Sequence, residues 1–147
     1  MYKHILVPTD GSTLSLRAAK NAVRLAKVHG ARITAFYAAP EYHPNIAGDY
    51  MPANFVPLAR FERQVQKTAD KHLSQVQKLA AVGKVACAGL CVSNDSPYQA
   101  IIKAANENNC DLIFMASHGR SGIAGLLIGS ETNKVLTHCK LPVLVYR

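Results

Sequence analysis

Residues 111–130 read DLIFMASHGRSGIAGLLIGS, and this stretch determines the fold class. The five consecutive apolar residues at 112–116 are typical of a strand buried on both faces of a parallel sheet. Four glycines follow, at Gly119, Gly122, Gly125 and Gly129. A helix-like segment then begins at Ser130, and the N–H groups and positive dipole of a helix start favour an anion. A strand, a glycine loop and a helix start in this order indicate a phosphate-binding loop, although the chain has no Gly-Lys-Ser/Thr of the Walker type.

Strand-like and helix-like segments alternate along the rest of the chain. Strand patterns cover residues 4–8, 31–39, 85–92, 112–116 and 141–146. Helical spacing of apolar residues covers 14–28, 58–82, 97–109 and 130–137, with Ser12 as a predicted N-cap and Gly30 and Gly83 as predicted helix ends. Alternation of this kind predicts an α/β doubly wound domain, a five-stranded parallel sheet with helices on both faces. The length of 147 residues favours one domain over 1–147.

Residues 40–57 interrupt the alternation, because four prolines there exclude a long regular element. Two interpretations stay open for this connection. It is either a surface loop that packs on its own side chains, or a mobile flap near the carboxyl edge of the sheet.

Composition limits the classes of function. The net charge is +8, but the Lys and Arg residues are spread along the chain. This favours a basic surface that attracts anionic ligands over a nucleic-acid platform. No charge-free apolar run reaches membrane length, and the chain enters its first strand without a signal peptide, so we expect a cytoplasmic protein.

Two positions carry binding chemistry in their own right. Asp10 follows the first strand, where its carboxylate could hold Mg²⁺ or a ribose hydroxyl, or could simply bond its own turn. Gly129 and Ser130 open the last helix, either as a phosphate site or as an ordinary helix cap. No motif of a catalytic nucleophile and base occurs, so no catalytic residue is predicted.

The glycine loop resembles the nucleotide-binding signature of the universal stress protein family, Gly-x2-Gly-x9-Gly-Ser/Thr. Gly119 and Gly129-Ser130 match it, and Ala116 stands at the first glycine. Residues 5–12 and 141–146 also resemble the family, so the similarity covers nearly the whole chain. A methyl group at Ala116 should be tolerated if the backbone there has ordinary strand dihedrals, and should be harmful if φ is positive.

The resemblance implies the strand order 3-2-1-4-5, which places the first and fourth strands at the switch point where ligands bind. It also implies ATP or AMP as the ligand, with Mg²⁺ held by the nucleotide and Asp10. The nucleotide-contacting positions would be Pro8, Thr9, Asp10, Ala38, Met115, Ala116, His118, Gly119, Arg120, Gly129, Ser130, Glu131 and Thr132. Alternatives remain for three of them: Met115 as plain core, His118 as a turn histidine and Arg120 as a solvated side chain.

The leading hypothesis is a cytoplasmic stress-response protein that binds ATP or AMP and acts as a dimeric binding or signalling module. The alternative is a nucleotide-free dimeric interaction module whose glycine loop is only structural. For either, residues 142–146 should form an edge strand that pairs with its copy in a homodimer.

Overall fold

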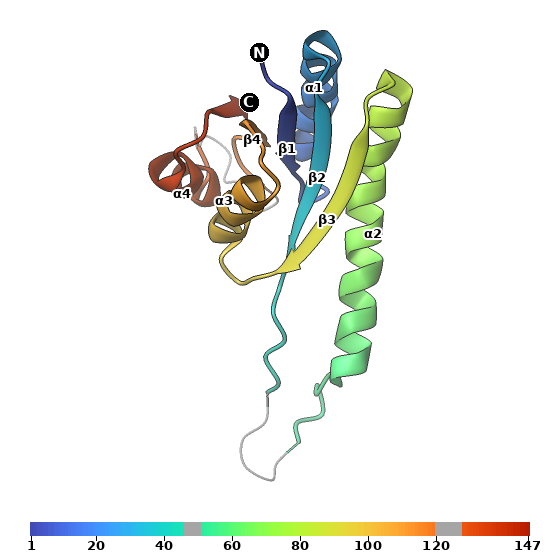
Figure 1. Ribbon diagram of the computed structural model, residues 1–147. Helices are drawn as coiled ribbons and strands as arrows, with labels where there is room; N and C mark the ends of the chain where they lie inside the picture. The colour runs from blue at the N-terminus through green and yellow to red at the C-terminus, as the bar shows by residue number, and fades with distance from the viewer. Residues whose placement is uncertain (46–50, 120–127) are drawn as a thin grey trace.

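The computed structural model describes residues 1–45, 51–119 and 128–147. The elements are β1 (His4–Pro8), α1 (Thr13–His29), β2 (Arg32–Ala39), α2 (Leu58–Gly83), β3 (Cys87–Ser93), α3 (Pro97–Glu107), β4 (Leu112–Ala116), α4 (Ser130–His138) and β5 (Val143–Tyr146). The strands form one parallel sheet in the order β3-β2-β1-β4-β5 (Figure 1). The doubly wound α/β fold and its strand order are therefore confirmed.

Alternate side chains of the central strands pack into two separate hydrophobic cores, one on each face of the sheet. Ile5 and Val7 of β1 pack with α1 and α2 on one face of the sheet. Leu6 packs with α3 and α4 on the other face. Because β1 and β4 are covered on both sides, their sequences are continuous apolar runs rather than alternating ones.

Hydrogen bonds that end a helix explain why two strands begin later than their patterns predict. The N–H of Ala31 donates to Ala26 of α1 at 2.8 Å, and the N–H of Val85 donates to Ala80 of α2 at 2.9 Å. These residues close the preceding helices, so β2 begins at Arg32 and β3 at Cys87. β5 begins at Val143 instead of 141, although the carbonyl of Pro142 already accepts the N–H of Ile113.

The prediction that α2 ends at Gly83 is confirmed, although Gly83 does not take the left-handed conformation that Gly30 has after α1. Gly83 is the last helical residue, and Lys84 takes the left-handed conformation with φ of 58°. Gly83 serves packing instead, because a Cβ there would lie 2.4 Å from Cγ1 of Val23 in α1. The glycine therefore lets α1 and α2 approach closely. The predicted cap at Ser12 and the left-handed end at Gly30 are confirmed.

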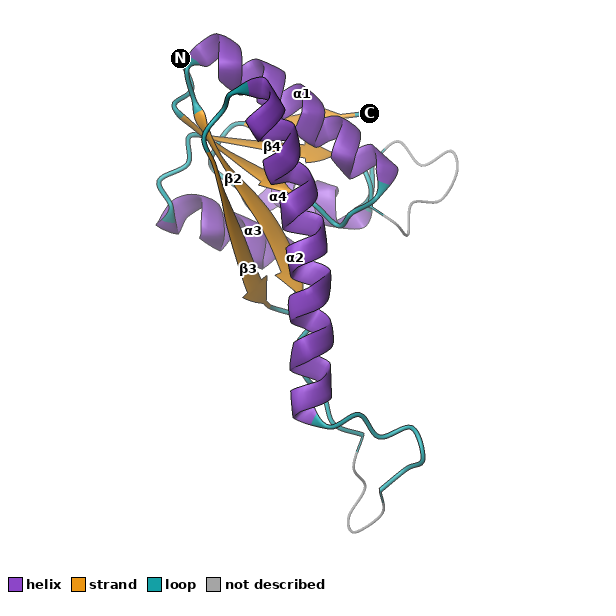
Figure 2. Cartoon of the chain, turned by 90° about the vertical axis from the view of Figure 1, so that its right-hand side faces the viewer, coloured by secondary structure: helices purple, strands orange, loops and turns teal. Residues whose placement is uncertain are grey.

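The described ends of the connection from β2 to α2, residues 40–45 and 51–57, project beyond the sheet together with the first turns of α2 (Figure 2). No residue of 58–68 is buried, and the first buried one in α2 is Ala69. The hydroxyl of Tyr42 donates to the carbonyl of Val56 at 2.7 Å, and the Tyr42 ring packs on Phe61 with centroids 5.2 Å apart. These two contacts join the described ends of the connection to each other and to the first turn of α2. None of the described helices is long and apolar enough to cross a membrane.

Candidate functional site

The loops that follow β1 and β4 meet at the carboxyl edge of the sheet. β1 lies between β2 and β4. From β1 the chain adds β2 and β3 on one side and then β4 and β5 on the other, so the strand order reverses between β1 and β4. A Cβ added at Gly119 would lie 2.6 Å from Oδ2 of Asp10, so the second loop passes directly over the first. Any side chain at this position would have to displace the Asp10 carboxylate. The predicted convergence of the two loops is therefore present.

The turn after β1 is held by its own side chains. Oδ1 of Asp10 accepts the N–H of Ser12 at 3.0 Å. Oγ1 of Thr9 accepts the N–H of Gly11 and also bonds the hydroxyl of Ser15, both at 3.2 Å. Asp10 is thus a turn aspartate through one oxygen, while its other oxygen faces the glycine loop. Pro8 ends β1 just before this turn and is half-buried.

His72 supports the turn from beneath, and its role was not predicted from the sequence. Gly11 has φ of 76°, and a Cβ on it would lie 2.1 Å from Nδ1 of His72. The His72 side chain is buried, and its ring packs edge-on against Tyr37 with centroids 5.2 Å apart. The available signal was the position of His72 on the apolar stripe of α2, one residue before Leu73.

Ala116 has the backbone geometry in which a methyl group should be tolerated. It is the last residue of β4 and pairs with Tyr146 of β5. Among the described residues other than glycine, only Lys84 and Asn109 have positive φ. The carbonyl of Ala116 accepts the buried hydroxyl of Thr132 at 3.0 Å, which joins the end of β4 to the first turn of α4.

The start of α4 lies against the same loop. The N–H of Gly129 donates to the carbonyl of Ser117 at 2.7 Å, and a Cβ at Gly129 would lie 3.1 Å from Cα of His118. An α-helix leaves the N–H groups of its first residues without an acceptor inside the helix. In α4 these belong to Ser130, Glu131 and Thr132. The positive end of the α4 dipole therefore lies at the carboxyl edge of β4.

The side chain of Glu131 is used within the fold. Its carboxylate accepts the N–H of Tyr98, at the start of α3, at 3.0 Å. It also accepts a hydrogen bond from the Lys134 ammonium at 2.7 Å, and this hydrogen bond raises the pKa of Lys134. The carboxylate of Glu131 therefore links α3 to α4, and its backbone N–H is the group that lies at the helix start.

The remaining predicted contact residues differ in how they are placed. Met115 and Ala38 both pack in the core beneath α3 and α4, with Met115 buried and Ala38 half-buried. Nδ1 of His118 bonds the Ser117 hydroxyl at 3.1 Å, within the turn after β4. Arg120 lies outside the described residues.

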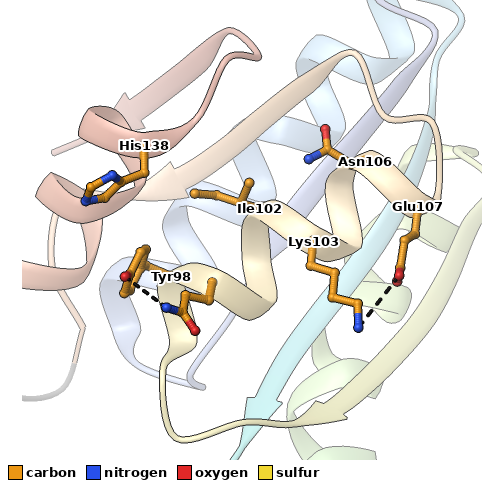
Figure 3. A pocket seen from close by; sticks show the side chains of 7 residues that line it. Tyr98, Ile102, Lys103, Asn106, Glu107 and His138 are labelled. Atoms are coloured by element: carbon orange, nitrogen blue, oxygen red, sulfur yellow. Dashed lines mark hydrogen bonds and ion pairs between the residues drawn. The ribbon is translucent and has the colours of Figure 1, made fainter.

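A separate hollow of about 520 Å³ lies between α3 and α4 (Figure 3). Polar groups that line it pair with one another. Lys103 forms an ion pair with Glu107 at 3.8 Å, and the Gln99 amide donates a hydrogen bond to the Tyr98 hydroxyl at 3.1 Å. His138 lines it from the carboxyl end of α4, opposite the end that meets the glycine loop. The hollow is therefore distinct from the candidate site.

The fold and the two converging loops define a doubly wound α/β domain whose topological switch point lies at the carboxyl edge of β1 and β4, the place where such folds generally bind ligands. The model of the universal stress protein family matches residues 1–147, and the chain belongs to this family. A universal stress protein of Thermus aquaticus is 33% identical over the full length of both chains.

Solved structures show the same similarity. The universal stress protein UspA from Lactobacillus plantarum superposes with a TM-score of 0.77 at 26% identity, covering 99% of this chain and 98% of that one. A universal stress protein in complex with cAMP has a TM-score of 0.71 at 25% identity, covering 99% of this chain and 97% of that one.

Proposed function

We propose that this protein binds ATP or AMP at the crevice between the Asp10 turn and the start of α4, and acts in the cytoplasm as a dimeric binding or signalling module of the stress response. The observation that carries the proposal is the approach of Gly119 to Asp10, at 2.6 Å from an added Cβ to Oδ2. This contact brings the glycine loop to the Asp10 turn, and the start of α4 lies against the same loop through Gly129. The similar protein whose structure contains cAMP supports an adenine nucleotide as the ligand.

The residues fit such a ligand. Gly119 presents bare backbone where a Cβ would lie 2.6 Å from Oδ2 of Asp10, and a Cβ at Gly129 would make a tight contact of 3.1 Å with Cα of His118. The N–H groups of Ser130 and the residues after it suit phosphate oxygens. Asp10 belongs to no group of three ligating side chains among the described residues, so Mg²⁺ there would need phosphate oxygens to complete its shell. Bound Mg²⁺ would neutralise phosphate charge, while the chain itself binds and orients the nucleotide.

Isothermal titration calorimetry tests the proposal directly. ATP with Mg²⁺ should release heat with one site per chain at a protein concentration of about 0.1 mM. Inorganic triphosphate in a parallel titration separates phosphate binding from recognition of adenosine. If neither ATP nor AMP gives heat, the alternative function, a nucleotide-free interaction module, is favoured.

We further propose that β5 pairs with its copy across a two-fold axis, through residues 142–146. β5 is an edge strand, and Leu144 is 37% exposed. The carbonyls of Pro142 and Tyr146 accept bonds from the β4 side, at 3.0 and 2.7 Å. Along a strand the backbone groups alternate in direction, so Val143 and Val145 direct theirs outward. An outward ladder of this kind is a template for a second strand.

Replacing Val145 with proline should convert the dimer into a monomer. Proline removes the outward N–H of residue 145 and leaves the β4 ladder intact. Val145→Ala is the matched control, since it shortens the side chain and keeps the donor. Light scattering at a protein concentration of about tens of micromolar measures the result. A wild type that is already monomeric, or a proline variant that stays dimeric, would rule this edge out.

A further inference from the structure

We propose that Glu41, His43 and Asp95 form a binding site for a divalent transition-metal ion, with Zn²⁺ as the best match. One ligand atom from each side chain lies within 4.8 Å of the others, and all three residues are exposed. The group lies beyond the ends of β2 and β3, whereas the nucleotide crevice lies beyond β1 and β4. The inference therefore stands independently of the nucleotide proposal.

The register of the sheet brings the three ligands together. β2 and β3 pair in parallel up to Ala39 and Ser93, and the N–H of Asn94 extends the pairing by donating to the Ala39 carbonyl at 2.9 Å. Asp95 follows directly. Glu41 and His43 are two residues apart after β2, a spacing that places side chains on one side of an extended segment. The two crossover segments thus meet with their ligand atoms facing one another.

A backbone hydrogen bond within the group and the contacts of Tyr42 beside it hold this arrangement. The N–H of Glu41 donates to Oδ1 of Asp95 at 2.9 Å, which fixes the carboxylate relative to the β2 segment. Tyr42, between the two ligands on that segment, is anchored by its hydrogen bond to Val56 and its ring contact with Phe61. The backbone is therefore positioned before any ion binds, which lowers the ordering cost of binding.

The donor set selects the class of ion. One imidazole and two carboxylates suit Zn²⁺ and similar first-row ions, while Mg²⁺ and Ca²⁺ prefer oxygen ligands alone. A hollow of about 270 Å³ borders Glu41 and His43, which leaves room for water as a further ligand. The competing interpretation is a plain surface ion pair, because Nε2 of His43 and Oδ2 of Asp95 are in direct contact. A bound ion would bridge these atoms and clamp the start of the 40–57 connection to the β3–α3 turn.

Titration of the full chain with ZnCl₂ tests the site. The wild type should bind one Zn²⁺, and His43→Gln and Asp95→Asn should each weaken binding by about tenfold or more, since each removes one of three ligands. His138→Gln is the matched control, because His138 is an exposed histidine outside the group and its loss should leave the affinity unchanged. Equal affinities of the wild type and His43→Gln would overturn the proposal and leave only the ion pair.

The absorption spectrum of the Co²⁺ complex tests whether the metal binds instead at a site that contains cysteine. Cys91 is exposed, so thiolate binding must be distinguished from binding at the proposed group. The Co²⁺ complex should show ligand-field bands without a thiolate charge-transfer band, and His43→Gln should abolish these bands. A thiolate band that survives in His43→Gln would contradict the proposal. Neither measurement depends on whether the chain binds ATP.

Discussion

Replacing Gly11 with alanine should lower the free energy of unfolding by about 3–4 kcal/mol, the sum of a backbone cost and a packing cost. With φ of 76°, an alanine here would be held in the left-handed region. Its Cβ would also lie 2.1 Å from Nδ1 of His72, which is buried and packs against the Tyr37 ring. Urea denaturation followed by circular dichroism measures the loss.

Gly30 provides the matched control for this variant. Its φ of 64° is similar, but a Cβ added there meets nothing within 4 Å. Gly30→Ala should therefore cost only the backbone term, about 1–2 kcal/mol. The double variant Gly11→Ala, His72→Ala should show coupling between the two sites, because removing the imidazole relieves the clash. Equal losses for Gly11→Ala and Gly30→Ala would show that His72 does not press on the turn.

Replacing Gly129 with aspartate should weaken ATP binding by about 100-fold relative to Gly129→Ser, from a charge repulsion of about 2–3 kcal/mol. Gly129 has φ of −72° and ψ of 160°, so either side chain is compatible with the backbone. Both variants add a Cβ at the same place, 3.1 Å from Cα of His118. Aspartate and serine are both good N-caps, so the stability of α4 should be similar in the two proteins. Their difference therefore isolates the effect of a negative charge at the proposed phosphate position.

Calorimetry with ATP and Mg²⁺ compares the two variants, and light scattering checks their assembly. The proposed β5 contact lies at the edge of the sheet, so we expect both variants to remain dimeric. Equal affinities in the aspartate and serine variants would place the phosphates elsewhere. If instead the wild type binds no nucleotide and Gly129→Asp keeps its protein partners and cellular phenotype, the glycine loop is structural.

Local patterns in the sequence determined most of the secondary structure. The apolar run of β4 was predicted at its observed bounds, 112–116, because burial on both faces requires each of its residues to be apolar. The cap at Ser12 and the left-handed Gly30 were predictable because a capping residue acts on groups only a few positions away. The strand order followed from the family resemblance, not from these patterns.

Contacts between residues far apart in the chain were decided only by the tertiary structure. The approach of Gly119 to Asp10 and the packing of His72 beneath Gly11 depend on how loops and helices pack over the sheet. The meeting of Glu41 and His43 with Asp95 depends on the register of β2 against β3. No periodicity encodes such contacts, because a hydrophobic pattern specifies which face of an element is buried but not which residue of another element lies opposite. The sequence by itself therefore determined most of the elements, while packing and register decided which side chains of different elements meet.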